Sequence, residues 1–197
     1  MIYIKFDDLL NFTQSVCLHA GIDKEVSNAV SIGLCETSLR GVDSHGIRLL
    51  PHYIDCALLG RKNPNPKYKV YKNFPAFLTL DADNTFGHAA GFKAIDLGMA
   101  SAKKYGLSAV SVINSSHPGA MASFALKAAR KGYMAFAFTH ADSLVCSYNS
   151  KDTYFGTNPI CFAAPVKDSE PFCLDMAPTS ISWNKLMSMI ENKNEIP

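Results

Sequence analysis

The chain has 197 residues, of which 48% are hydrophobic and 18% are charged. This content is too apolar for a disordered chain, and the length allows one large domain or two small ones with a sizeable core. Nineteen basic residues against seventeen acidic ones give a net charge of +2, which excludes the strong basic excess that is typical of nucleic-acid-binding proteins.

The amino-terminal third of the sequence has the pattern of a helical segment. Apolar residues recur at helical spacing, and three helices are predicted, over residues 6–20, 23–39 and about 47–59. The segment RGVDSH (40–45) breaks the pattern as a turn, and Pro51 leaves the start of the third helix uncertain. The Pro- and Asn-rich segment RKNPNPKY (61–68) is predicted to be a linker or a long loop.

After this linker the apolar period changes to that of strands. Strands are predicted over 67–73, 76–83, 107–113, 133–139, 160–166 and 171–176, and helices over 88–105, 120–131 and 182–195, the last stopping at Ile196 and Pro197. We expect a hairpin from the first two strands, a parallel pair within 107–138, and irregular structure over 141–158. The predicted fold class is α/β, with a domain boundary between residues 1–66 and 67–197.

The amino terminus and the cysteines predict a cytoplasmic protein. Lys5, Asp7 and Asp8 interrupt the apolar residues at the start, so no signal peptide is expected, and no stretch is long enough for a membrane span. None of the six cysteines form a C-x-x-C pair, and we interpret them as reduced, mostly buried thiols, with a disulfide framework as the alternative.

The densest polar cluster is RGVDSHGIR, residues 40–48, which is predicted to be a turn that opens a helix. His45 is a candidate proton donor or acceptor near neutral pH, which Asp43 or Ser44 would orient. Arg48 is a candidate for binding a carboxylate through two hydrogen bonds. The alternative is a solvated loop in which Ser or Asp caps the helix.

Three further clusters follow predicted strands. His117, in NSSHPGA, is a second candidate for catalysis or orientation, because ligands of α/β sheets bind at the carboxyl ends of strands. Thr157 and Asn158 follow a glycine that would let the backbone approach a ligand closely. Asp175 begins the segment DMAPTS and could hold ribose hydroxyls. Each cluster also has a simpler interpretation: turns for the first two, and a helix cap for Asp175.

Other possible sites have weaker support. His45, His52, Asp55 and Cys56 have the spacing of metal ligands on a helix, but Cys56 lies in an apolar run and is more simply a core residue, so no metal is predicted. His88 is expected to cap a helix. The sequence lacks G-x-G, the P-loop, G-x-S-x-G and H-E-x-x-H, so any nucleotide site must be built differently from a Rossmann turn.

In their order along the chain, these motifs resemble those of the malate/L-lactate dehydrogenase family, which also includes ureidoglycolate, L-sulfolactate and diketogulonate dehydrogenases. The resemblance runs from R-G-V-D-S-H-G through N-S-S-H-P-G-A and G-T-N-P-I to L-D-M-A-P-T-S, and it covers nearly all 197 residues. It implies a non-Rossmann nucleotide-binding domain over 67–197 after a helical substrate-side segment over 1–66. It also implies reduction of 2-oxo acids, or oxidation of 2-hydroxy acids, with NAD or NADP.

The resemblance assigns roles to individual residues. His45 is similar to the family's proton donor, Arg48 to its carboxylate-binding arginine, with Ser44 beside it, and His117 to a second histidine that serves as acid/base in some members. The choice between the two histidines stays open. Cofactor contacts are implied for Asp175, Met176, Ala177, Thr157 and Asn158. The partners implied are a small 2-oxo or 2-hydroxy acid and a second copy of the chain, with neither nucleic acid nor membrane.

Two departures from the family's pattern are visible. Residues 147–150 (SYNS) stand where members usually have Pro and Gly-Gly. Members are also much longer, so the sequence is expected to be the front part of a two-domain enzyme. The alternatives to an active enzyme are a truncated, inactive remnant and a non-enzymatic binding module with the same fold.

Overall fold

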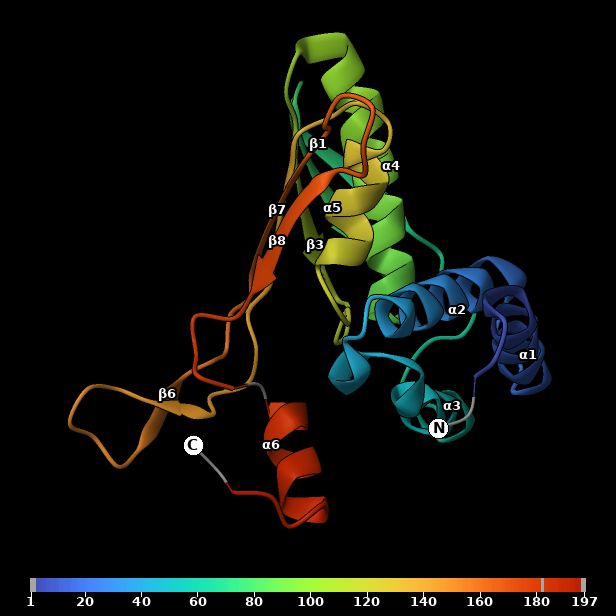
Figure 1. Ribbon diagram of the computed structural model, residues 1–197. Helices are drawn as coiled ribbons and strands as arrows, with labels where there is room; N and C mark the ends of the chain where they lie inside the picture. Colours follow the sequence, from blue (N-terminus) through green and yellow to red (C-terminus); the bar gives the residue numbers. More distant parts are fainter. Residues whose placement is uncertain (1–2, 182, 196–197) are drawn as a thin grey trace. The chain divides into compact units, whose positions relative to one another are not determined.

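The computed structural model describes residues 3–181 and 183–195 (Figure 1). The predicted stop at Ile196 and Pro197 lies outside the described residues. The chain divides into two compact units, Met1–Ala120 and Met121–Pro197, and each contains both helices and β-sheet. The predicted α/β fold with small mixed sheets is therefore confirmed.

The first unit begins with the predicted helices, which are α1 (Phe6–His19), α2 (Lys24–Leu39) and α3 (Leu50–Leu58). The α2 helix begins after Asp23, whose carboxylate accepts a hydrogen bond from the Glu25 backbone N–H at 2.8 Å. Two short 3-10 turns, η1 (Asp43–His45) and η2 (Ile47–Leu49), precede α3. Pro51 fits here because the first turn of a helix needs no backbone N–H.

A three-stranded sheet completes the first unit. Its elements are β1 (Lys69–Phe74), β2 (Phe77–Asp81), helix α4 (Gly87–Tyr105) and β3 (Ala109–Ile113). The predicted hairpin is confirmed as the antiparallel β1–β2 pair, and β2 pairs with β3 in parallel. The parallel pair was expected within 107–138, and that prediction is wrong. The parallel pair is β2–β3, and α4 is the connection between the two strands. Parallel neighbours need a long crossover connection of this kind.

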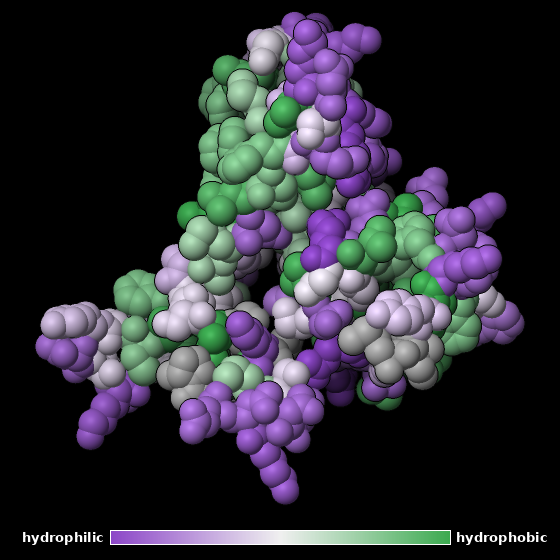
Figure 2. Space-filling model, viewed as in Figure 1, coloured by the Kyte–Doolittle hydropathy of each residue, from purple (hydrophilic) through white to green (hydrophobic). Residues whose placement is uncertain are grey.

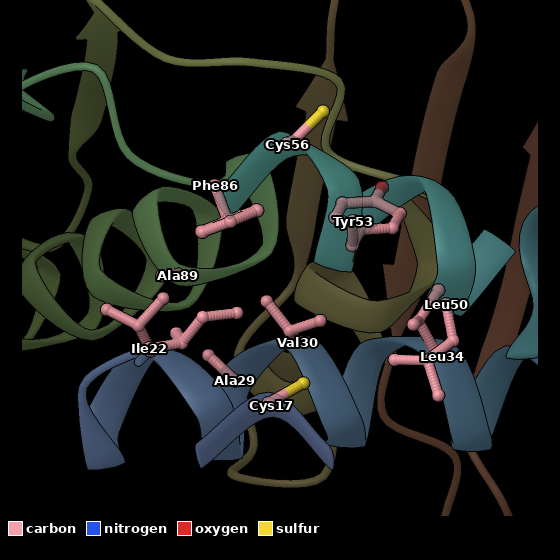
Figure 3. Packing of buried hydrophobic residues seen from close by; sticks show 11 residues of the cluster. Cys17, Ile22, Ala29, Val30, Leu34, Leu50, Tyr53, Cys56, Phe86 and Ala89 are labelled. Carbon is pink, nitrogen blue, oxygen red and sulfur yellow. The ribbon is translucent and has the colours of Figure 1, made fainter. Parts of the chain in front are cut away.

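The core of the first unit lies between its helices (Figure 3). Val30 and Leu34 of α2 are fully buried, and Tyr53 and Cys56 of α3 pack into the same cluster as Phe86 at the start of α4. The amino-terminal helices and α4 therefore share one core. The domain boundary after residue 66 stays a prediction.

The second unit contains a second sheet and its covering helix. Its elements are α5 (Ala122–Ala129), β4 (Ala135–Phe138), β5 (Val145–Cys146), β6 (Thr153–Phe155), β7 (Ile160–Ala164), β8 (Phe172–Met176) and α6 (Trp183–Glu191). The order β4-β7-β8 is antiparallel throughout, and α5 packs on this sheet. The irregular structure expected over 141–158 is interrupted by the β5–β6 pair. These strands have only two and three residues, so they are too short to be predicted from alternating apolar residues.

One face of the second sheet is apolar and exposed. Phe136 pairs with Phe162, Phe162 pairs with Leu174, and Phe138 is 64% exposed. Figure 2 shows apolar residues in green over the region where Figure 1 draws β7 and β8. Among the described helices, none is both long enough and apolar enough to cross a lipid bilayer.

Candidate active site

The turn that carries His45 is held against the end of α2. The backbone N–H of Ile47 donates to the Ser38 hydroxyl at 2.8 Å, and a Cβ at Gly46 would lie 2.1 Å from the same hydroxyl oxygen. Gly46 therefore lets η1 and η2 approach α2 closely. The turn brings the Ser44 hydroxyl within 2.8 Å of His45 Nδ1, as the sequence predicts for an orienting partner.

The loop that carries His117 follows the carboxyl end of β3 and is tied to the loop after β2. Asn114 adopts a left-handed backbone conformation, and its side chain donates to the Asp81 carboxylate at 3.0 Å. The Ser116 hydroxyl accepts a hydrogen bond from the Gly87 backbone N–H at 3.0 Å. A Cβ at Gly87 would lie 2.5 Å from the carbonyl oxygen of His117. The two loops at this edge of the parallel strands are therefore locked together.

The two predicted catalytic histidines lie together. The ring centroids of His45 and His117 are 5.5 Å apart, with 27° between the ring planes. Tyr53 of α3 brings its hydroxyl oxygen within 3.2 Å of His117 Nδ1 and 3.4 Å of the His117 carbonyl oxygen. His117 is exposed and His45 half-buried, so a small molecule in solvent can reach the pair.

A third histidine, His88, lies behind this pair. It is fully buried in α4, and its ring is 5.2 Å from the ring of Tyr53. Among the described residues, neither ring nitrogen of His88 has a hydrogen-bond partner. A Cβ at Gly33 would lie 2.1 Å from its Cδ2, and a Cβ at Gly119 would lie 2.4 Å from its Nε2. Two glycines thus make room for this ring.

Burial and neighbouring histidines favour the neutral forms of His88 and His117. The pKa of His88 is lowered to about 3, first by its burial and then by the neighbouring His117 and His45. The pKa of His117 is also lowered, first by partial burial of its ring and then by the neighbouring His45 and His52. Burial raises the pKa of Tyr53 far above neutrality, so its hydroxyl keeps its proton.

The remaining residues predicted for substrate binding lie on the same turns. Arg48 belongs to η2, three residues after His45, and is exposed. Sequence reasoning did not include Tyr53, although its place in the helix after the SHG motif was a possible signal. The expectation that His88 caps a helix is wrong, because Phe86 is the cap residue and His88 lies inside α4, where its side chain is buried.

The predicted cofactor residues lie in the second unit. Asn158 and the segment from Asp175 to Ala177 come together at one end of the sheet, because Ile160 pairs with Met176. Asn158 has a left-handed backbone, and its amide oxygen accepts from the Ala141 N–H at 3.1 Å. Thr157, next to it, is half-buried.

Asp175 shows the helix-capping interaction that the sequence also allowed. Its carboxylate accepts a hydrogen bond from the Ala122 backbone N–H, at the start of α5, at 2.8 Å. A carboxylate there disfavours a phosphate at this helix end. The side chain of Met176 is 54% exposed.

His52 and Cys56, which the sequence spaces like metal ligands on a helix, lie close together as a pair. His52 Nε2 lies 3.7 Å from Cys56 Sγ, and Cys56 is buried in the core. Within residues 3–181 and 183–195, no three His, Cys, Asp or Glu side chains are grouped so as to hold a metal ion.

Comparison with known sequences agrees with the order of the motifs. The family model for malate/L-lactate dehydrogenase matches residues 4–197. A malate dehydrogenase from Pyrococcus abyssi is 36% identical over 191 residues, which cover 97% of this chain and 52% of the relative. Hydroxycarboxylate dehydrogenase B from Escherichia coli K12 is 34% identical, over 90% of this chain and 50% of the relative.

Comparison with solved structures agrees with the fold. Malate dehydrogenase from Pyrococcus horikoshii OT3 matches with a TM-score of 0.90 and 34% identity, over 94% of this chain and 53% of that one. Malate dehydrogenase from Entamoeba histolytica matches with a TM-score of 0.95 and 29% identity, over 100% of this chain and 55% of that one. The chain spans about half the length of the relatives it matches. It belongs to the malate/L-lactate dehydrogenase family.

Proposed function

We propose that the protein transfers a hydride between NAD(P)H and a small 2-oxo acid, or in reverse from the 2-hydroxy acid, as a malate/lactate-type dehydrogenase. The observation that carries this proposal is the pairing of His45 and His117, 5.5 Å apart, on one exposed site beside the turn of Arg48. The names of the relatives, malate dehydrogenase and hydroxycarboxylate dehydrogenase, support the same class of substrate.

The histidine pair provides one proton at a time. Two positive charges at 5.5 Å repel by about 1 to 3 kcal/mol for an effective dielectric constant between 80 and 20. His117, with its lowered pKa, stays neutral. His45 is then the group that carries the proton to the substrate oxygen, oriented by Ser44.

The substrate carboxylate would be bound by Arg48, whose planar guanidinium suits a two-pronged contact. The nicotinamide cofactor, when bound, supplies the hydride. The residues that would hold it are Asp175, Met176, Ala177, Thr157 and Asn158.

The test measures oxidation of NADH and of NADPH with a panel of 2-oxo acids that includes oxaloacetate and pyruvate. We expect turnover with at least one pair, a loss of at least about 100-fold in His45→Gln, which lacks the acid, and a smaller loss in His117→Gln. His19→Gln is the matched control, because His19 is exposed on α1. Folded protein that neither turns over nor binds either cofactor would favour an inactive remnant or a non-enzymatic module.

We further propose a cytoplasmic homodimer. Cys161 Sγ and Cys173 Sγ lie 3.9 Å apart, at the distance of a hydrogen bond between thiols, which suits a reducing compartment. The exposed apolar face of the second sheet supports association. Sedimentation at micromolar concentration should give the mass of two chains, and a single-chain mass would contradict the dimer.

A further inference from the structure

We propose that Tyr53 is a positioning residue that fixes both the orientation and the neutral tautomer of His117. The effect of Tyr53 on catalysis rests on the proposed function, whereas its effect on the tautomer of His117 does not. Tyr53 is a residue of α3, and the atoms that it contacts belong to a loop 64 residues later in the chain.

The contact between Tyr53 and His117 involves three polar atoms, of which only the hydroxyl and Nδ1 can carry a proton. The Tyr53 hydroxyl oxygen lies 3.2 Å from Nδ1 of His117 and 3.4 Å from the carbonyl oxygen of the same residue. The carbonyl can only accept, whereas Nδ1 of a neutral ring either accepts or donates. The hydroxyl has one proton, and the raised pKa of Tyr53 keeps it in place.

One arrangement satisfies all three atoms. The hydroxyl donates its proton to the carbonyl oxygen, and Nδ1–H of His117 donates to the hydroxyl oxygen. The neutral ring then carries its hydrogen on Nδ1 and leaves Nε2 as an acceptor. The opposite tautomer would make Nδ1 and the carbonyl compete for a single proton.

Tyr53 is itself held firmly enough for this role. Its side chain is 97% buried, since its relative exposure is 3%. Its ring lies 5.2 Å from that of His88 and 6.0 Å from that of Phe86, and both come from the start of α4 (Figure 3 shows Tyr53 and Phe86). The His88 ring in turn fills the space that the missing side chains of Gly33 and Gly119 leave.

The first experiment reads the tautomer directly in the full chain. Imidazole ¹⁵N chemical shifts at pH 7.5, assigned by their loss in His117→Gln, should show His117 protonated on Nδ1. Tyr53→Phe removes only the hydroxyl, and the ring should then change to a mixture or to the Nε2–H form. Tyr148→Phe is the matched control, because Tyr148 is 94% exposed, and it should leave the shifts unchanged.

The two readouts separate this proposal from the proposed function. An Nε2–H ring in the unaltered protein would overturn the proposal even if Tyr53→Phe does not fold. In active protein, Tyr53→Phe should lower kcat about tenfold with little change in KM, since the hydroxyl orients the His117 ring that stacks on the proton donor His45 and does not bind substrate. Unchanged kcat with an altered tautomer would remove the catalytic consequence, while absent activity with the expected tautomer would count only against the dehydrogenase.

Discussion

The missing side chain at Gly33 makes room for the ring of His88. Glycine inside a helix ordinarily costs up to about 1 kcal/mol relative to alanine, so Gly33 in α2 is retained against helix propensity. A Cβ there would lie 2.1 Å from His88 Cδ2, and the ring is enclosed on its other side by Gly119. The position of this glycine is explained by the site and not by the helix.

We therefore expect Gly33→Ala to lower the free energy of unfolding by about 1 to 3 kcal/mol through overpacking. Gly98→Ala in α4 is the matched control. A Cβ at Gly98 would meet Ser108 Oγ and Val110 Cγ2 at an ordinary 3.5 Å, so this variant should gain up to about 1 kcal/mol. Urea denaturation of both variants measures whether each substitution lowers or raises the free energy of unfolding. A higher value for Gly33→Ala would show that the His88 ring is not confined there.

The buried His88 also predicts a dependence of stability on pH. Its pKa is about 3 in the folded protein, while in the unfolded chain it is near the usual value of about 6.5. Between these values the unfolded state binds a proton that the folded state refuses. The free energy of unfolding should therefore fall as pH drops below about 6.5, by up to about 1.4 kcal/mol per pH unit from this residue.

Urea denaturation at pH 7.5, 6.0 and 5.0 measures this slope. His88→Gln cannot take up the proton and should make the slope shallower, leaving the part that comes from the lowered pKa of His117. His19→Gln, at an exposed position, should leave the slope unchanged. Equal slopes in the original protein and in His88→Gln would mean that another group controls the acid sensitivity.

Sequence reasoning proposed His45 from the dense polar cluster around it, and His117 from its place in a loop directly after a predicted strand. It missed Tyr53 and misplaced His88, because a tyrosine at helical spacing and a histidine beside a glycine look like ordinary core and cap residues. Their role depends on contacts between segments that lie 31 to 64 residues apart in the chain. Periodicity along one segment does not contain that information.

At the scale of elements, the start of helix α5 is capped by a residue of strand β8, much later in the chain. The Asp175 carboxylate on β8 accepts from Ala122 N–H. Asp175→Ala should lower the free energy of unfolding by about 1 kcal/mol, the usual loss for a capping side chain. Asp142→Ala, at an exposed loop position, is the control for loss of a charge, and equal effects of the two substitutions would remove the capping role.

The elements differ in how far local pattern predicts them. The β1–β2 hairpin follows from alternation on both sides of a short turn, and α1, α2 and α4 follow from apolar spacing. The parallel partner of β3 could not be predicted in this way. Nothing within 107–113 distinguishes β2 from β4 as its neighbour, because the choice depends on where α4 packs.

At the scale of the whole molecule, the described residues expose one apolar face of a sheet. Phe136, Phe138, Phe172 and Met176 are each more than half exposed and share the sheet β4-β7-β8. Patches of this kind mark surfaces that associate. We expect the 197-residue chain, at concentrations low enough to keep it monomeric, to enhance the fluorescence of the dye ANS under native conditions.

The control for the ANS prediction is Phe136→Ser with Phe138→Ser, which makes the middle of this face polar and should reduce the fluorescence. Phe12→Ser on α1, another exposed phenylalanine, is the matched substitution outside the sheet and should not reduce it to the same extent. If the two β4 substitutions leave the dye fluorescence unchanged, the dye binds an apolar surface other than this sheet face.

The chain spans about half the length of the relatives to which it is similar, yet it contains the histidine pair, the arginine turn and the predicted cofactor segments. The central claim is that these residues take part in hydride transfer to a 2-oxo acid. The most direct measurement is a single-turnover reaction of the folded 197-residue chain with NADH or NADPH deuterated at the nicotinamide C4. The account predicts deuterium at C2 of the 2-hydroxy acid, abolished by His45→Gln. No transfer from either cofactor to any 2-oxo acid tested, in protein that unfolds cooperatively, would contradict it.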